Sequence, residues 1–268
     1  MLSWGIFVPM SNFTLAFNLL AHRITALSGG GSDPFFKDFG QHVLADDPEF
    51  TGYEFIEKIR SDLLNNTETV PARDFGAGSR SLRKERTIGQ ITKVSSINPR
   101  YGRLLNRLVR HYRPSRIIEL GTAAGISTLY LASGNREAEV ITVEGNPRLA
   151  EIASGNFRKA GLKNVTVINS TFDEALSEII KDLSSGLLIY IDGNHTKEAT
   201  LRYYSVFATQ FGINPILIFD DINWSKEMRG AWKIISQQAP GGTLIDLFFM
   251  GICFPDLSTP LQFRRMNY

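Results

Sequence analysis

Acidic side chains stand at or near the ends of four short apolar segments of the chain. These acids are Glu119, Glu144, Asp192 and the pair Asp220–Asp221. Carboxylates in such places can accept hydrogen bonds from the hydroxyl groups of a sugar, pair with a cationic group or ligate a hard metal ion. The residues around each acid indicate which of these roles it can take.

The first acid, Glu119, is followed by a glycine-containing turn that runs to Ser127. Gly121 lets the backbone turn sharply, and Gly125 lets a ligand or the next helix come close. A dinucleotide-binding loop would carry a glycine where Ala123 stands, and no Walker lysine follows, so a phosphate cradle is disfavoured. An acid at this point favours a ligand with a cationic head group.

Two later positions extend this ligand toward a nucleoside. Glu144 lies 23 residues after Gly121, where a carboxylate can accept hydrogen bonds from both hydroxyl groups of a ribose. Residues 169–172 offer polar atoms and an aromatic plane to an adenine ring. Taken alone, Phe172 is more simply explained as a core residue.

The remaining acids follow two consecutive apolar segments, with Asp192 after the first and Asp220–Asp221 after the second. Adjacent parallel strands lie about 5 Å apart, so the three carboxylates should meet at one sheet edge. They would repel one another unless a cation neutralises them. Mg²⁺ or Ca²⁺ fits such oxygen ligands better than zinc does. Alternatively, the Asp220–Asp221 pair caps the following helix.

Short apolar strands alternate with helical patterns from about residue 98 onward. Strands are expected at 116–120, 139–143, 165–168, 187–191, 216–219 and twice within 243–254. Helices are expected before Pro114 and at 127–132, 147–159, 173–183, 196–211 and 226–236. The alternation predicts an α/β fold, a doubly wound, mostly parallel seven-stranded sheet whose strands all carry ligand-binding residues at one edge.

The first 97 residues lack the regular alternation of strands and helices, and segments rich in turn residues separate short helical patterns. Apolar residues recur at helical spacing within 53–64 and predict an amphipathic helix there. We therefore expect residues 1–97 to form a mainly helical extension or lid, and residues 98–268 to form the ligand-binding domain. The glycine-rich segment 74–80 favours a surface turn that can take part in such a lid.

Composition excludes several classes of protein. A hydrophobic fraction of 43% and a charged fraction of 21% are typical of a soluble globular chain. The single cysteine, Cys253, excludes an intrachain disulfide and a cysteine-based metal site, and the four histidines are too scattered to predict a histidine-rich metal cage. No apolar run reaches 18 residues and the first thirty residues lack a basic region, so we expect a cytoplasmic protein without a membrane span.

Basic residues are concentrated between Arg80 and Arg116, where eleven Lys and Arg residues accompany one acid, Glu85. Arg103, Arg107 and Arg110 share one face of the helix expected before Pro114. Such a face can bind RNA, but few aromatic residues accompany it. A solvated face or a subunit contact is the favoured interpretation.

Residues 98–254 resemble the class I S-adenosylmethionine-dependent methyltransferases. The stretch 119–125 matches the glycine-rich first motif of that family, and 143–145 matches its ribose-binding acid. The resemblance implies S-adenosylmethionine as the cofactor, with three groups of binding residues. These are Glu119, Gly121, Thr122, Ala123, Gly125 and Ser127 for the methionine part, Glu144 and Gly145 for the ribose, and Thr171 and Phe172 for the adenine.

Within that family the chain is most similar to metal-dependent O-methyltransferases related to catechol O-methyltransferase and to those that modify macrolide and aminocoumarin sugars. The resemblance places Asp192, Asp220 and Asp221 on the three metal-ligand positions, and an aspartate at 221 is closer to the sugar-modifying enzymes. His195 falls where the catechol enzyme has its catalytic lysine. His195 and Asp192 are thus the candidate catalytic residues, although a helix-start hydrogen bond explains His195 equally well. In metal-free relatives Asp192 would instead bind the amino group of the donor.

The leading hypothesis is O-methylation of a small hydroxylated molecule, a sugar or a phenol, with Mg²⁺ or Ca²⁺ as a second cofactor. The resemblance also implies a homo-oligomer, most simply a dimer. Two alternatives stay open: an RNA or protein N-methyltransferase that uses the basic 80–116 surface, and a non-catalytic binding protein of the same fold. The acceptor itself is not identified by any pattern in residues 1–97.

Overall fold

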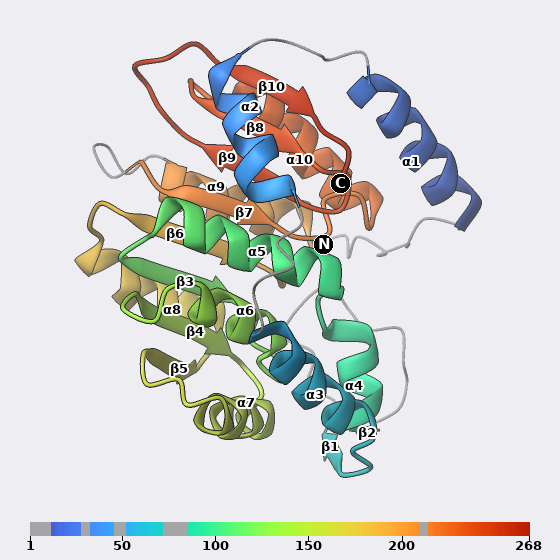
Figure 1. Cartoon of the computed structure of the whole chain (residues 1–268), viewed down its shortest axis with the longest axis vertical. Coiled ribbons are helices and arrows are strands. Elements are labelled where there is room, and N and C mark those ends of the chain that lie inside the picture. The colour runs from blue at the N-terminus through green and yellow to red at the C-terminus, as the bar shows by residue number, and fades with distance from the viewer. Residues whose placement is uncertain (1–11, 28–32, 46–51, 72–84, 209–213) are drawn as a thin grey trace, which may run out of the picture. The chain divides into compact units, whose positions relative to one another are not determined.

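The computed structural model describes residues 12–27, 33–45, 52–71, 85–208 and 214–268 (Figure 1). These residues fall into two compact units. Unit A comprises the described residues between 33 and 187. Unit B comprises residues 12–27 and the described residues from 188 to 268.

Unit A contains three parallel strands in the order β3-β4-β5. Their bounds are Arg116–Leu120 for β3, Glu139–Glu144 for β4 and Val165–Asn169 for β5. Two helices alternate with them, α6 (Ile126–Gly134) and α7 (Pro147–Lys159). Strand β3 forms because its apolar run can be buried on both sides, and every residue after the first is buried.

The other helices of unit A surround this core. They are α2 (Pro34–Phe39), the π-helix η1 (Gly40–Leu44), α3 (Gly52–Leu64), α4 (Ile88–Ser95), α5 (Pro99–Tyr112), α8 (Phe172–Ile179) and the 3₁₀ turn η2 (Ile180–Asp182). Helix α5 starts at the capping residue Asn98 and ends at Arg113, which has left-handed backbone (φ 47°) and precedes Pro114. It packs against α6, and α3 packs against α4 beside the antiparallel pair β1 (Thr69–Pro71) and β2 (Glu85–Thr87) (Figure 1).

Unit B contains five strands in the order β10-β8-β9-β7-β6. The strands are β6 (Leu187–Ile191), β7 (Ile216–Phe219), β8 (Thr243–Asp246), β9 (Gly251–Phe254) and β10 (Gln262–Arg265), with helices α1 (Asn12–Leu27), α9 (Lys197–Ala208) and α10 (Lys226–Gln238). Strands β6 and β7 are parallel, whereas β9 runs antiparallel to both of its neighbours. Cys253 is buried within β9.

Helix α1 is tied to the strands of unit B by a buried polar group. His22 Nε2 lies 3.1 Å from Asp246 Oδ1, and the indole Nε1 of Trp232 donates to Asp246 Oδ2 at 3.2 Å. The described parts of residues 1–97 are mainly helical but are divided between the units, with α1 in B and α2 to α4 in A. The boundary at residue 97 between an extension and a ligand-binding domain stays a prediction, and the glycine-rich segment 74–80 lies outside the described residues.

The expected α/β fold with a mostly parallel sheet is confirmed, and the sheet has eight strands rather than seven. The additional strand is β10, which pairs with β8 in parallel. Its sequence, Gln-Phe-Arg-Arg, lacks an apolar run, and three of its four residues are exposed. None of the helices in the described ranges combines the length and the hydropathy that a membrane span needs.

The basic face expected on α5 is wrong for two of its three arginines. Arg107 is buried, and its Nε donates to the carbonyl of Val43 at 2.7 Å. The guanidinium of Arg103 lies 5.2 Å from the ring centre of Tyr53, a cation–π distance. Only Arg110 of the three is exposed. Arg103 and Arg107 thus connect helices of unit A. The helical spacing of charged residues in the sequence does not distinguish such buried contacts from a solvated face.

Candidate functional site

The glycine-containing turn after β3 takes the unusual backbone that its sequence predicts. Gly121 (φ 112°), Ala123 (φ 46°) and Gly125 (φ 88°) all adopt positive φ. The amide groups of Gly121 and Thr122 donate to the carbonyl of Val143 at 3.1 and 3.2 Å, so the turn is fastened to the end of β4. Side chains at the ends of β3 and β4 are thereby brought to one edge.

Gly125 has no room for a side chain. A methyl group at this position would lie 2.7 Å from the ring of Phe157, and the φ of 88° is strained for any residue with a Cβ. We expect Gly125→Ala to lower the melting temperature by roughly 5–10 °C, since overpacking and left-handed backbone together cost about 2–3 kcal/mol. Gly155→Ala on α7 is the matched control, because its nearest atom is 3.9 Å away. A Gly125→Ala protein that melts with the wild type would contradict this packing.

Glu119 is fully buried beneath the turn and accepts hydrogen bonds from hydroxyl groups. Thr142 Oγ1 donates to Glu119 Oε2 at 2.5 Å, and Thr128 Oγ1 donates to the same oxygen. Because Thr142 uses its proton in this bond, Thr122 must donate in its own contact with Thr142. Burial raises the pKa of Glu119, and the hydroxyl groups of Ser127, Thr128 and Thr142 oppose that rise. The carboxylate thus joins β3, β4 and the start of α6, where Ser127 is buried.

Glu144, the last residue of β4, supports the same turn from the other side. Its Oε2 accepts from the amide of Ala123 and its Oε1 from the amide of Asn146, each at 2.8 Å. Burial raises the pKa of Glu144, whereas the two amide donors lower it. An ionised carboxylate has about four lone-pair positions. Two of them therefore stay available to a pair of hydroxyl groups.

The segment after β5 reaches the same edge. Its Ser170 amide donates to the carbonyl of Glu144 at 3.2 Å, and the side chain of Asn169 donates to that carbonyl at 2.6 Å. Thr171 caps α8 in a reciprocal arrangement with Glu174, and Phe172 begins that helix half-buried. The predicted convergence of the loops after β3, β4 and β5 is present within unit A. Gly145, half-buried directly after β4, belongs to it.

A second group of candidate residues follows β6 and β7 in unit B. Ile191 and Phe219 are paired in the parallel ladder, so Asp192 and Asp220 occupy equivalent positions one residue further on. The hydroxyl of Tyr190 donates to Asp220 Oδ2 at 2.7 Å and lies 3.4 Å from Asp192 Oδ2. These two acids meet as predicted.

Asp221 and His195 complete this group. His195 Nε2 lies 3.7 Å from Asp192 Oδ1 and 4.0 Å from Asp221 Oδ2. Burial, and then the neighbouring charge of Asp221, raise the pKa of Asp220 to about 7, and burial raises that of Asp221 to about 6. Burial lowers the pKa of His195, which favours the neutral imidazole. Two adjacent half-buried acids whose pKa values are raised suit a bound cation.

The alternative roles as helix caps do not hold. Helix α10 is capped by Ser225, whose Oγ accepts from the amide of Met228 at 3.1 Å, and not by the Asp220–Asp221 pair. In the first turn of α9, Thr196 Oγ1 accepts from the amide of Ala199 at 3.3 Å, and Glu227 Oε2 accepts from the amide of Lys197 at 3.2 Å. His195 is therefore left to its acidic neighbours.

The three aspartates are nevertheless more widely spaced than a closed set of metal ligands. In the described part of the chain, one group of three or more potential ligands has all its ligand atoms within 4.8 Å of one another, and it consists of Asp38, His42 and His111. The interpretation of the histidines as scattered is wrong for this pair, whose rings are stacked 5.0 Å apart. Residue 111 lies far from residue 42 in the sequence, so spacing could not have predicted the contact.

Tyr190 is a candidate site residue that the sequence analysis missed. It lies two residues before Asp192 in a buried strand, so both side chains project to the same face. That spacing of two, with a hydroxyl in an otherwise aliphatic strand, was the available signal.

Several known proteins similar to this chain are described as methyltransferases. A family model described as a methyltransferase domain matches residues 118–222. A putative O-methyltransferase of Mycobacterium sp. (strain JLS) is 33% identical over 104 residues, which are 38% of this chain and 46% of the relative. A catechol O-methyltransferase of Niastella koreensis is 29% identical over 102 residues, or 37% and 46% of the two chains. The chain thus spans less than half the length of these relatives.

Solved structures with the same fold cover more of the chain. The alignment with an O-methyltransferase from Bacillus cereus, solved with SAH, covers 81% of this chain and 96% of that protein, with a TM-score of 0.55 and 18% identity. The alignment with a methyltransferase from Podospora anserina, also bound to SAH, covers 94% of this chain and 100% of that protein, with a TM-score of 0.55 and 16% identity. At these identities the likeness establishes the fold.

Proposed function

We propose that this chain, which has the class I methyltransferase fold and a methyltransferase domain at residues 118–222, transfers a methyl group from S-adenosylmethionine to a hydroxyl oxygen of a small molecule. The observation that carries the proposal is Glu144. It ends β4, orders the turn before α6 through the amide of Ala123, and keeps acceptor capacity for two hydroxyl groups. The relatives named as O-methyltransferases support oxygen as the atom that is methylated.

The donor-binding residues are those of unit A. We assign the ribose to Glu144 and Gly145, and the adenine surroundings to Thr171 and Phe172. The turn residues Gly121, Thr122, Ala123 and Gly125 would hold the methionine part. Glu119 and Ser127, both buried under that turn, then act as positioning residues that keep its backbone in place.

A divalent cation is the second proposed cofactor. The chemistry of the donor set suits a hard ion such as Mg²⁺ or Ca²⁺, because Asp192, Asp220 and Asp221 offer carboxylate oxygens and the latter two carry raised pKa values. The three side chains would have to move closer together around the ion. When bound, such an ion lowers the pKa of a coordinated hydroxyl group. In a metal-free enzyme, Asp192 would instead bind the amino group of the donor.

His195 is the proposed proton acceptor. Its lowered pKa keeps the imidazole neutral and able to take a proton at neutral pH. The acceptor hydroxyl would lose its proton to His195 Nε2 as the new O–CH₃ bond forms and the S–CH₃ bond of the sulfonium breaks, leaving S-adenosylhomocysteine. Asp192, 3.7 Å from His195 Nε2, would stabilise the imidazolium.

The other hypotheses receive less support. The relatives named as O-methyltransferases do not favour an RNA or protein N-methyltransferase, and Arg103 and Arg107 are engaged within unit A. A cytoplasmic location, a homodimer and the role of residues 1–97 as a lid stay predictions.

Calorimetric titration with S-adenosylmethionine tests the donor assignment. We expect one donor per chain with a dissociation constant in the range of about 1 μM to 1 mM, and competition by S-adenosylhomocysteine. Repeating the titration in EDTA and in Mg²⁺ separates donor binding from metal binding. Transfer of a labelled methyl group to a panel of catechols, phenols and sugars then tests the acceptor class. Absence of donor binding would contradict the enzyme assignment altogether.

A further inference from the structure

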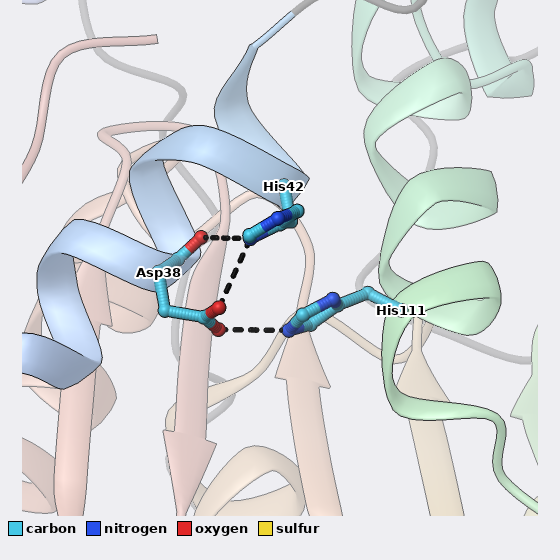
Figure 2. A group of neighbouring side chains, drawn as sticks. All are labelled: Asp38, His42 and His111. Atoms are coloured by element: carbon cyan, nitrogen blue, oxygen red, sulfur yellow. Dashed lines mark hydrogen bonds and ion pairs between the residues drawn. The ribbon is translucent and has the colours of Figure 1, made fainter.

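A compact group of metal-binding side chains lies in unit A, apart from every residue assigned above. His42 Nδ1 is 2.9 Å from Asp38 Oδ1, and His111 Nε2 is 2.8 Å from Asp38 Oδ2. Figure 2 shows the carboxylate of Asp38 beside the two imidazole rings and joined to both of them. The rings are stacked almost parallel, with an interplanar angle of 7°. Three ligand atoms therefore converge on one small volume.

The local backbone holds the first two ligands together. Asp38 lies in α2 and His42 in the π-helix η1 that continues it, four residues later, so both side chains lie on one face about one turn apart. The wide turn is closed by the Ala45 amide, which donates to the carbonyl of Gly40 at 3.1 Å. Wide turns of this kind occur frequently at functional sites.

The third ligand comes from the last turn of α5. His111 lies one turn beyond Arg107, and the bond from Arg107 Nε to the carbonyl of Val43 fastens η1 to α5. The buried side chain of Val43 lies in η1 next to His42. The site is thus assembled by contacts other than those of the ligands themselves, which reduces the entropy that an ion must overcome on binding.

We propose that Asp38, His42 and His111 bind a zinc ion. Two imidazole nitrogens and one carboxylate oxygen form a donor set that zinc prefers and that magnesium does not. Zinc binds such atoms at about 2.0–2.1 Å, so tetrahedral ligands lie about 3.3 Å apart. To reach this value the hydrogen-bond distances of 2.8 and 2.9 Å widen by roughly half an ångström. The two stacked rings must also tilt, so that the in-plane lone pairs of both nitrogens point to the same ion.

Solvent completes the coordination. The side chains of His42, Asp38 and His111 are 55%, 46% and 25% exposed, so an ion can enter and keep a water molecule as its fourth ligand. Zinc binds unprotonated nitrogens, so the protons that His42 Nδ1 and His111 Nε2 donate to Asp38 are released to solvent or move to the other nitrogen of each ring as the ion binds. The bound ion would clamp η1 to the end of α5.

Metal-stripped protein titrated with Zn²⁺ and with Co²⁺ tests this site. We expect one equivalent of Co²⁺ to give visible absorption bands of a four-coordinate ion, and Zn²⁺ to abolish them. A zinc concentration about 100-fold above its dissociation constant should raise the melting temperature by roughly 5–10 °C. A large excess of Mg²⁺ should change neither result.

The variants His42→Gln and His111→Gln should lose the cobalt bands and the zinc-dependent rise in melting temperature. His42 is more than half exposed, so its variant is expected to melt like the wild type in EDTA. The double variant Asp220→Asn/Asp221→Asn is the control for the other acids and should retain both signals. The proposal is overturned if zinc has no effect on the wild type, or if its effect survives in His42→Gln and disappears in the double variant.

Discussion

Replacing Asp220 by asparagine is expected to lower magnesium-stimulated methyl transfer at least about 100-fold. Stabilisation of developing charge by a bound metal contributes several kcal/mol, and each 1.4 kcal/mol is a factor of ten in rate. Asparagine has the same shape and can still accept the hydrogen bond from Tyr190, so the change is confined to one negative charge. The measurement is initial rate against Mg²⁺ concentration with an acceptor identified from the panel.

Stability separates this effect from misfolding. Asp220 and Asp221 are neighbouring half-buried acids with raised pKa values, so removing one charge should leave the melting temperature in EDTA unchanged or slightly higher. Glu198→Gln, an exposed acid in the first turn of α9, is the matched control and should keep the full rate. Wild-type magnesium dependence in Asp220→Asn would refute ligation by this residue.

Glu144→Ala is expected to weaken the binding of S-adenosylmethionine about 100-fold. Two hydrogen bonds from ribose hydroxyl groups to a charged acceptor contribute about 1.5–3 kcal/mol each, and part of this is regained through solvent. Glu144→Gln should fall between the alanine variant and the wild type, because its amide keeps one acceptor oxygen. Calorimetry gives the affinities directly.

Because Glu144 also accepts from the amides of Ala123 and Asn146, the loss contains a contribution from the displaced turn. A 2′-deoxy analogue of S-adenosylhomocysteine separates the two contributions. The wild type should prefer the natural ligand over the analogue about tenfold, and Glu144→Ala should bind both equally. If the variant keeps the preference of the wild type for the natural ligand, Glu144 does not bind the ribose. Glu151→Gln, on the exposed surface of α7, is the control.

Much of the sheet could be predicted from the sequence because its parallel strands are short apolar runs bounded by turn residues. The bounds of β3, β6, β7 and α7 agree with those expected. Acids that follow such strands must come to the sheet edge, and this is why the meeting of Asp192 with Asp220 was foreseeable. Periodicity is a local property, and these features depend on local sequence.

The features that were missed depend on distant partners. Strand β10 exists because β8 offers it an edge, and its own residues are mostly exposed. The contact between His42 and His111 requires η1 to lie against α5. The burial of Arg107 likewise follows from its bond to Val43. A single sequence contains no signal for such pairings, so charge spacing alone indicated a solvated face.

The one cysteine of the sequence has a practical consequence. Cys253 is buried in β9, and burial raises the pKa of its thiol, so in the folded protein it stays protonated and shielded from alkylating reagents. A cysteine introduced on the surface of either unit would then be the single site that takes up a fluorophore or a spin label. Pairs of such probes, one in each unit, would test whether adding ligands changes the distance between the two labelled sites.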